Sequence, residues 1–203
     1  MNKKFKLILQ NRITENTSRG IEYANHPELW HGIKFEKKEY PKNSFIVGEG
    51  QICDSIYLIV KGSVRCLIKH QGKDTTTWFA FENQPVMLPV SYCLQEPTCE
   101  MIQALEDTSV WVLKRSDLQV ASQSNFKINS VVSLLMEATM ARMMMRASSL
   151  QSEFAEERYD DLITHQPDVI QRVPLRHIAT YIGVKVETLS RIRRNFKLRQ
   201  NVK

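Results

Sequence analysis

The spacing of apolar residues divides the chain into stretches of different periodicity. Residues 1–31 and the segment after Asp117 repeat apolar residues at intervals of three and four, which predicts amphipathic helices. Between them, short apolar or alternating segments are separated by turn residues such as Lys61-Gly62, a pattern typical of an all-β sandwich or barrel. The predicted strands are residues 33–40, 44–47, 55–60, 63–70, 75–81, 101–104 and 110–114.

One long helix is predicted over residues 125–151. Its apolar stripe is wider than packing against one surface requires, so we expect two of its sides to be covered. The second side packs either on a twin helix in a dimer or on another part of the same monomer. Met140, Met143, Met144 and Met145 lie on successive faces, which favours adaptable packing over a soft-metal site.

The segment 173–196, VPLRHIATYIGVKVETLSRIRRNF, has the pattern of a helix-turn-helix. Gly183 stands where the turn needs a positive φ or no Cβ, and Ala179 is small enough to let a second helix cross closely. A helix at 153–163 and a turn near Pro167 precede this segment. A helical hairpin with a solvated charged face is the alternative. The apolar positions at helical spacing are Leu175, Ile178 and Ile182 before the turn, and Val184, Leu189 and Ile192 after it.

Charge is concentrated at the C-terminal end. The chain carries a formal charge of +6, but residues 171–203 hold nine Lys or Arg and one acid, whereas the other 170 residues hold 19 bases and 21 acids. Such a basic module suits the phosphates of DNA. Charge alone would equally attract an anionic membrane or another acidic partner. The helix-turn-helix pattern favours DNA, because a membrane-surface helix needs one continuous apolar face.

Other function classes find little support. No apolar run approaches a transmembrane length, and the signal-like N-terminus has only Leu7–Leu9 as its apolar stretch, so we expect no membrane association and a cytoplasmic protein. A cupin-like metalloenzyme needs several histidines inside the β-domain, where only His70 is available. We therefore expect no catalysis, no metal and no cofactor. The four cysteines, expected to be free thiols, are Cys53, Cys66, Cys93 and Cys99.

A β-domain, a long helix and a C-terminal helix-turn-helix together resemble the Crp/Fnr family of bacterial transcription regulators. The likeness is densest in Tyr40–Ile68, where glycines 48 and 50 form a pair, followed by the hydrophobic strand Ile56–Val60 and a turn at Gly62. The resemblance implies an α+β fold: a β-roll (a double-stranded jelly roll of the cyclic-nucleotide-binding type) with N-terminal helices over residues 1–123, a dimerisation helix over 124–151, and a helix-turn-helix domain over 152–203.

The resemblance also implies partners and contacts. It favours the homodimer, which reads an inverted repeat in double-stranded DNA, with RNA polymerase as a further possible partner. The residues expected at the dimer helix are Ile128, Val132, Leu135, Met136, Met140 and Met143.

The expected DNA contacts divide by chemistry. By alignment, Glu187 and Arg191 fall where the family touches bases; glutamate can accept from cytosine, and arginine can donate twice to guanine. An intrahelical pair between the two is the alternative. Val186 replaces an arginine of well-known relatives, so we expect a different operator. Thr188 completes the expected base contacts. The residues expected at the DNA backbone are Arg176, Lys185, Ser190, Arg193, Arg194, Lys197 and Arg199.

The effector site departs from the family pattern. The Gly-Glu of the phosphate-binding cassette corresponds here to Leu88-Pro89, and its Arg-Ser to Cys99-Glu100. Pro89 removes an amide donor, and Glu100 puts an acid where a phosphate should lie. No lysine or arginine occurs between Lys73 and Lys114. We therefore predict no binding of cyclic AMP or cyclic GMP, and the effector is an unknown small molecule or absent.

Two family features are not expected. No cysteine precedes Cys53, which argues against an iron–sulfur sensor, and isolated histidines argue against haem. Only seven residues follow the recognition helix, too few for a β-hairpin wing, so a basic C-terminal arm is expected to contact phosphates instead. A ligand-sensing or scaffold β-roll without DNA binding remains the alternative function.

Overall fold

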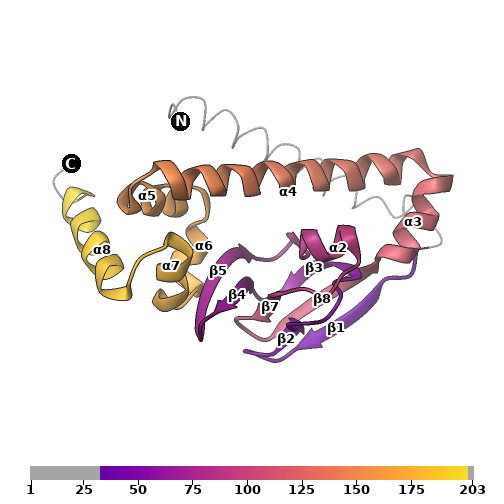
Figure 1. Ribbon diagram of the computed structural model, residues 1–203, viewed down its shortest axis with the longest axis horizontal. Coiled ribbons are helices and arrows are strands. Elements are labelled where there is room, and N and C mark those ends of the chain that lie inside the picture. The colour runs from indigo at the N-terminus through magenta and orange to yellow at the C-terminus, as the bar shows by residue number, and fades with distance from the viewer. Residues whose placement is uncertain (1–32, 201–203) are drawn as a thin grey trace.

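The structure, a computed structural model, describes residues 33–200, except for the side chains of Ser124 and of residues 197–200. The helices predicted over residues 1–31 lie outside this range. Figure 1 shows a β-roll with a long helix running over it and a group of shorter helices at one end. No helix in the described part of the chain is long and apolar enough to cross a membrane.

The β-roll consists of two antiparallel four-stranded sheets. One has the order β1-β8-β3-β6 and the other β2-β7-β4-β5. Seven of the eight strands coincide with predicted ones, with ends that shift by at most three residues; the exception is the two-residue β6. The strands are β1 (Glu36–Tyr40), β2 (Phe45–Val47), β3 (Ser55–Lys61), β4 (Val64–His70), β5 (Lys73–Ala80), β6 (Pro85–Val86), β7 (Glu100–Ala104) and β8 (Thr108–Lys114).

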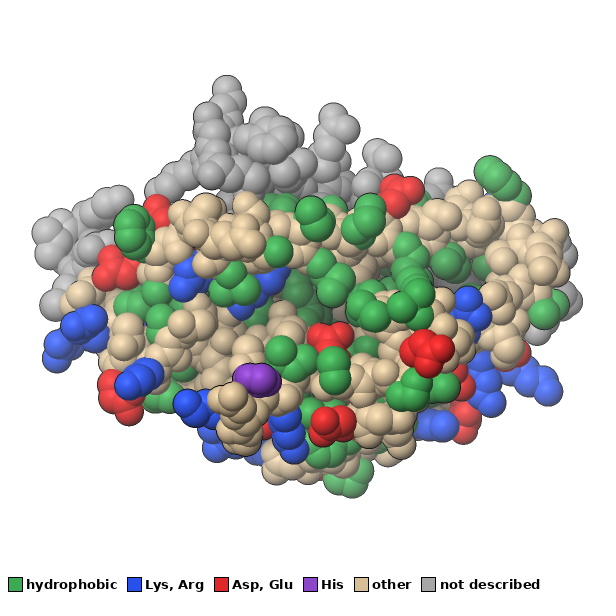
Figure 2. Space-filling model, in the orientation of Figure 1, with side chains coloured by type: hydrophobic (Ala, Val, Ile, Leu, Met, Phe, Trp, Pro, Cys, Tyr) green, Lys and Arg blue, Asp and Glu red, His purple; other side chains and the backbone are tan. Residues whose placement is uncertain are grey.

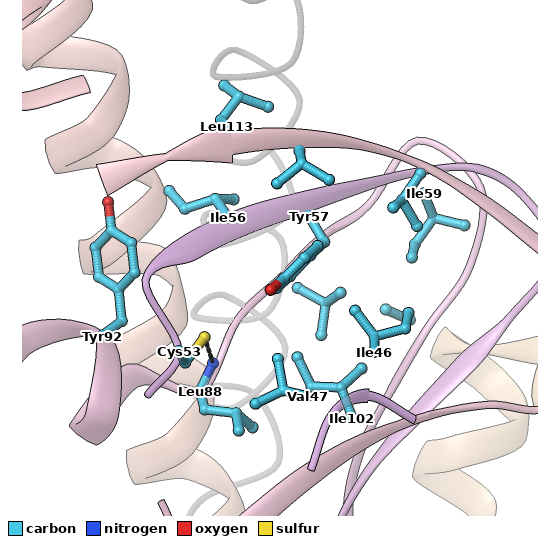
Figure 3. Packing of buried hydrophobic residues seen from close by; sticks show 14 of the residues in the cluster. Ile46, Val47, Cys53, Ile56, Tyr57, Ile59, Leu88, Tyr92, Ile102 and Leu113 are labelled. Atoms are coloured by element: carbon cyan, nitrogen blue, oxygen red, sulfur yellow. Dashed lines mark hydrogen bonds between the residues drawn. The ribbon is translucent and has the colours of Figure 1, made fainter. Parts of the chain in front are cut away.

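The first core lies between the two sheets. Strand β4 pairs with β5 on one side and β7 on the other, so its residues are shielded on both edges. Ile59, Val64 and Ile102 are fully buried there. Figure 3 shows how aliphatic side chains from both sheets fill the space between them. Burying such side chains is the main source of the roll's stability.

A short helix that the sequence analysis did not predict, α2 (Pro89–Leu94), packs on the roll. The Cys53 amide donates to the Ser91 hydroxyl at 3.0 Å. The Leu88 amide donates to the Cys53 sulfur at 3.4 Å, a bond that Figure 3 shows. Proline at the first helical position is favourable because no intrahelical partner is lost there. These bonds attach the start of α2 to the segment before β3.

Helices α3 (Arg115–Ser124) and α4 (Phe126–Ser152) carry the chain back across the roll. Asn125 separates them with an extended backbone, and its side chain caps α4 by accepting from the Lys127 amide at 3.0 Å. The long helix predicted over 125–151 is thus confirmed within one residue. Ile128 and Val131 of α4 are buried against the roll.

The helices at the end of the roll are α5 (Ala155–His165), α6 (Pro167–Arg172), α7 (Leu175–Ile182) and α8 (Val186–Gln200). We call α5–α8 the helical module. The predicted apolar positions face inward: Ile178, Ile182 and Leu189 are almost fully buried. Short α6 occupies the position of the predicted turn near Pro167.

Three side chains of the roll belong to the core of the helical module. Phe79, Phe81 and Leu105 are at most 5% exposed and pack with residues of the module, among them Tyr181. The Phe79 and Tyr181 rings lie 5.1 Å apart. The roll and the module therefore share a continuous hydrophobic core in addition to their covalent connection.

Candidate functional site

The turn between α7 and α8 is fixed by hydrogen bonds at the end of α7. Gly183 has φ +81°, in the left-handed region that favours glycine. Its amide donates to Ala179 at 2.9 Å and to Thr180 at 3.2 Å, and the Val184 amide donates to Ala179 at 3.0 Å. Arg158 of α5 donates to the Ile182 carbonyl at 2.8 Å. The predicted helix-turn-helix geometry is therefore present, with Gly183 at its turn.

One face of α8 is exposed, and it carries the residues predicted to read bases. Because Leu189 and Ile192 are buried against α7 and α5, the opposite side of α8 points outward. Thr188 and Arg193, predicted at the bases and the backbone respectively, are only half-buried. The exposed residues of this face are Val186, Glu187, Ser190, Arg191 and Arg194.

The remaining predicted DNA contacts lie around this face. Arg176 on α7 and Lys185 at the turn are exposed. Helix α8 continues to Gln200, so the expectation of an arm that begins at Lys197 is wrong: Lys197 and Arg199 belong to the helix, and their side chains fall outside the described ones. Glu187 and Arg191, both described, form no ion pair with each other. Both side chains are thus available to a partner of α8.

A buried arginine joins α7 to the roll. Arg65 on β4 is 3% exposed and donates to Asp74 at 2.8 Å, to Gln103 at 2.8 Å and to Nδ1 of His177 at 2.8 Å. Since a guanidinium only donates, Nδ1 accepts this bond, and Nε of Arg176 lies 3.3 Å from the other ring nitrogen, Nε2, so the imidazole faces cationic donors on both sides. Burial, together with Arg65 and Arg176, lowers the pKa of His177 to about 4.

A second arginine joins α6 to two turns of the roll. Arg172 makes a bidentate bond to Glu82, at 2.6 and 2.8 Å, and a further bond to Glu106 at 3.0 Å. The hydrogen bonds from Arg172 lower the pKa of Glu82 to about 2. The Gly62 amide donates to the same carboxylate at 2.8 Å. Charge-assisted contacts therefore reinforce the shared core.

A cavity of about 260 Å³ lies between the roll and α4. Figure 2 shows hydrophobic side chains gathered along α4 and in the hollow beneath it. The walls of the cavity are mostly apolar, as is typical of small-molecule sites. The residues of the roll and α2 that line it include Ile56, Trp78, Val86, Leu88 and Pro89, and those of α4 include Leu135, Met143 and Leu150.

The structure brings most of the predicted effector residues to this cavity. Leu88, Pro89 and Glu100 line it, whereas Cys99 is exposed and does not. The start of α2 has no side-chain cap. Burial raises the pKa of Glu100, whose carboxylate accepts from the Thr77 hydroxyl at 3.4 Å.

Two cationic residues of this cavity were missed by sequence reasoning. Arg142 and Arg146 line it from α4, although the β-segment itself contains no lysine or arginine near the cassette. Their i, i+4 spacing within an apolar, methionine-rich helix was the available signal, because such residues share a helix face. Arg142 lies over the Trp78 ring at 5.6 Å, and Arg146 over the Tyr181 ring at 3.9 Å.

The residues predicted at the dimer helix fall on different sides of α4. Ile128 is buried in the core of the roll, with Val132 and Met136 packed against it. Leu135 and Met143 line the cavity. Met140 is 64% exposed. Part of the wide apolar stripe is therefore used within the monomer, and the remainder faces outward.

The thiols and the metal-binding residue types form no further site. Cys53 and Cys66 are buried, and burial raises the pKa of both thiols. Within residues 33–200, no group of three or more His, Cys, Asp or Glu side chains is arranged to hold a metal ion.

Residues 37–125 match the cyclic nucleotide-binding domain family. The matched range covers the roll, the cassette region and α3. A comparison with curated protein sequences finds no match.

Several solved structures share the fold of most of this chain. FixK2 from Bradyrhizobium japonicum is 20% identical with a TM-score of 0.68, over 83% of this chain and 87% of that one. A chain from Eubacterium rectale, described as a transcriptional regulator of the Crp/Fnr family, is 15% identical with a TM-score of 0.65, over 86% and 84%. The regulator CLP from Xanthomonas campestris, described as c-di-GMP responsive, is 13% identical with a TM-score of 0.61, over 90% and 93%.

These likenesses concern the fold. They confirm the predicted α+β architecture of a jelly-roll domain followed by helices and a C-terminal helix-turn-helix. They also confirm the resemblance on which that prediction relied.

Proposed function

We propose that this chain, which carries a cyclic nucleotide-binding domain and has the fold of Crp/Fnr regulators, is a homodimeric, sequence-specific DNA-binding transcription regulator that acts in the cytoplasm and is not an enzyme. The exposed face of α8 is the observation that supports this most directly. It presents an acid and two arginines on a helix whose other side is buried in the module.

The proposed base contacts are made by Glu187 and Arg191, with Val186 and Thr188 beside them. Glutamate accepting from cytosine and arginine donating to guanine are pairings that discriminate bases in the major groove. Exposed Arg176, Lys185, Ser190 and Arg194 are placed for phosphate contacts, which hold the register without reading sequence. In a two-fold symmetric dimer, the two α8 helices enter successive major grooves about 34 Å apart.

The proposed effector site is the cavity between the roll and α4. Pro89 and Glu100 line this cavity and correspond, by the resemblance, to residues of the family's phosphate-binding cassette, where they supply neither an amide donor nor a cation, so we propose an effector other than cyclic AMP or cyclic GMP. Arg142 and Arg146 bring positive charge to this cavity from α4 instead of from the cassette of the roll. Calorimetry that shows micromolar or tighter binding of either cyclic nucleotide would contradict this part of the proposal.

The function is tested by selecting bound sequences from a pool of random duplex DNA with the full-length chain. We expect an inverted repeat, and an affinity that falls steeply with salt concentration because phosphate binding releases counterions. Failure to bind duplex DNA in a salt-sensitive manner would favour a scaffold or sensor without DNA binding.

Once the selected sequence is known, Arg191→Ala tests whether Arg191 contacts a base. We expect a loss of about 1–3 kcal/mol on that sequence, with relaxed specificity at the base pair it contacts. Arg194→Ala is the matched control on the same exposed face, and it should weaken binding to all duplexes alike. Equal losses for Arg191→Ala on selected and random DNA would assign Arg191 to the phosphates instead.

A further inference from the structure

Arg146 belongs to two sites at once. Its side chain lines the cavity beneath α4, and its guanidinium carbon lies 3.9 Å from the centroid of the Tyr181 ring. Tyr181 is on α7, the first helix of the helix-turn-helix, and is 9% exposed. A single side chain of α4 therefore touches both the cavity and the helical module.

Tyr181 is also held from the roll. Its ring packs on Phe79, with the planes inclined at 47°. Phe79 follows Trp78 on β5, and Trp78 lines the cavity beneath Arg142. Both α4 arginines are therefore stacked on aromatic rings at the boundary between the cavity and the module.

The lining of the cavity favours an anion. Apart from two arginines and one acid, Glu100, its walls are apolar or weakly polar. Burial lowers the pKa of Arg142 and Arg146, which shows that desolvation opposes their charged forms. Within the described residues, Arg146 forms no ion pair with a carboxylate. An anionic group would compensate its charge better than an aromatic ring does.

Resting on the proposed function, we propose that the cavity binds a compact organic acid with an apolar body, and that Arg146 couples this binding to the helical module by pairing with the ligand's carboxylate while it keeps its contact with the Tyr181 ring. The cavity volume of about 260 Å³ limits the ligand to a small molecule.

The coupling follows from the two kinds of contact that one guanidinium can make. A guanidinium whose face lies on an aromatic ring keeps the N–H donors in its plane, so it can form a bidentate bond to a carboxylate in the cavity and still contact the ring. A ligand shifts a conformational equilibrium only when it interacts differently with the two states. The Arg146–Tyr181 contact provides that difference, because an Arg146 held by the ligand's carboxylate favours the arrangement in which α7 lies against it.

Binding is tested by calorimetry with naphthalene-2-carboxylate and octanoate, each compared with its neutral amide. We expect at least one acid to bind about tenfold more tightly than its amide, equivalent to about 1.4 kcal/mol. Arg146→Gln should reduce this preference below about threefold and leave amide binding unchanged. Arg115→Gln is the matched control, since Arg115 also lies over a tyrosine, Tyr92 at 5.9 Å, but outside the cavity.

Equal affinity for acid and amide, binding of neither acid, or an unchanged preference in Arg146→Gln would overturn the assignment of ligand class. Circular dichroism and thermal melting establish that each variant is folded. These measurements involve no DNA, so their outcome is independent of the proposed function.

Coupling is tested by hydrogen exchange of α7 with and without the acid that binds. We expect slower exchange in α7 of the wild type on binding, the same response in Tyr181→Phe, which keeps the ring, and none in Tyr181→Leu. Unchanged or faster exchange in the wild type at saturating acid would overturn the coupling. If duplex binding itself fails, the proposed function is rejected, while the exchange experiment still decides this inference.

Discussion

At the scale of single residues, His177 stands out as a neutral imidazole buried in a cationic setting. Its ring faces Arg65 and Arg176, with Asp74 nearby on the other side of Arg65. Its role is not predictable from the sequence, because nothing in the spacing of α7 indicates which inward residue meets a polar group of the roll.

We predict that His177 makes stability depend on pH between about 6.5 and 4. Its pKa is about 4 in the folded protein and 6.5 ordinarily, so unfolding takes up a proton in this window. The stabilisation is complete above pH 6.5 and is lost as the pH falls towards 4, by at most about 3 kcal/mol. Denaturant titrations across this range measure the effect.

His177→Gln is the matched variant, because its amide oxygen can accept from Arg65 but does not titrate. Carboxylates such as Glu82 titrate in both proteins and cancel in the comparison. We expect the variant to lose less stability than the wild type from pH 6.5 to 4. Parallel pH profiles would show that His177 is not responsible.

At the scale of elements, the residues of α4 have three different surroundings: some pack on the roll, some line the cavity, and some are exposed to solvent. Met140 and Met144 are 64% and 68% exposed. If these methionines pack on a twin helix, introducing a charge into that contact should separate the protomers.

We therefore predict that Met140→Glu and Met144→Glu convert a dimer into a monomer and reduce duplex affinity. Sedimentation equilibrium measures the first effect and a binding titration the second. Val120→Glu on α3, where the residue is 69% exposed, is the control and should leave the mass unchanged. A wild-type monomer, or dimeric glutamate variants, would contradict the assignment of this face.

The elements that the sequence predicts well are those with a long or repeated pattern. Six of the seven predicted strands, α4 and the α7–α8 pair have enough residues for a period to be recognised, whereas the three-residue β2 is delimited by turn residues on both sides. By contrast, α2 and α6 have six residues each and β6 has two. Their conformation depends on tertiary contacts, such as the bonds that join Cys53 to Leu88 and Ser91.

The candidate site was predictable only where its residues are local in sequence. The exposed face of α8 follows from helical periodicity, and Leu88, Pro89 and Glu100 follow from the cassette. The cavity arginines do not, because their direction depends on the rotation of α4 about its axis as it packs on the roll. That rotation is decided by contacts such as Ile128 and Val131 in the core.

At the scale of the whole molecule, the helical module is docked on the roll through Arg172. Its bonds to Glu82 and Glu106 join α6 to two separate turns. The side chains of this cluster are about a quarter to two-fifths exposed, so solvent weakens the interaction.

We predict that Arg172→Gln lowers the free energy of unfolding by about 1–2 kcal/mol, since two carboxylates lose a bidentate partner. Hydrogen exchange should accelerate in α6 and α7 more than in the roll. The free energy of unfolding of Arg172→Lys should lie between those of the wild type and Arg172→Gln, because lysine keeps the charge without the planar fork. Lys37→Gln removes an exposed pair with Glu39 and serves as the neutral control. If hydrogen exchange in Arg172→Gln accelerates equally in the roll and in the helical module, Arg172 does more than hold the module against the roll.

The shared core has a consequence for exchanging parts between relatives. Phe79, Phe81 and Leu105 belong to the roll in sequence but to the module in packing. A chimera that joins α5–α8 to an unrelated sensor domain would lack these three side chains. The apolar surface of the helical module that they cover would then be exposed, and the core of the module would be incomplete. To remain foldable, a transplanted helical module must keep Phe79, Phe81 and Leu105, so the boundary of the transferable unit passes through the β-sheet rather than through the connection between α4 and α5.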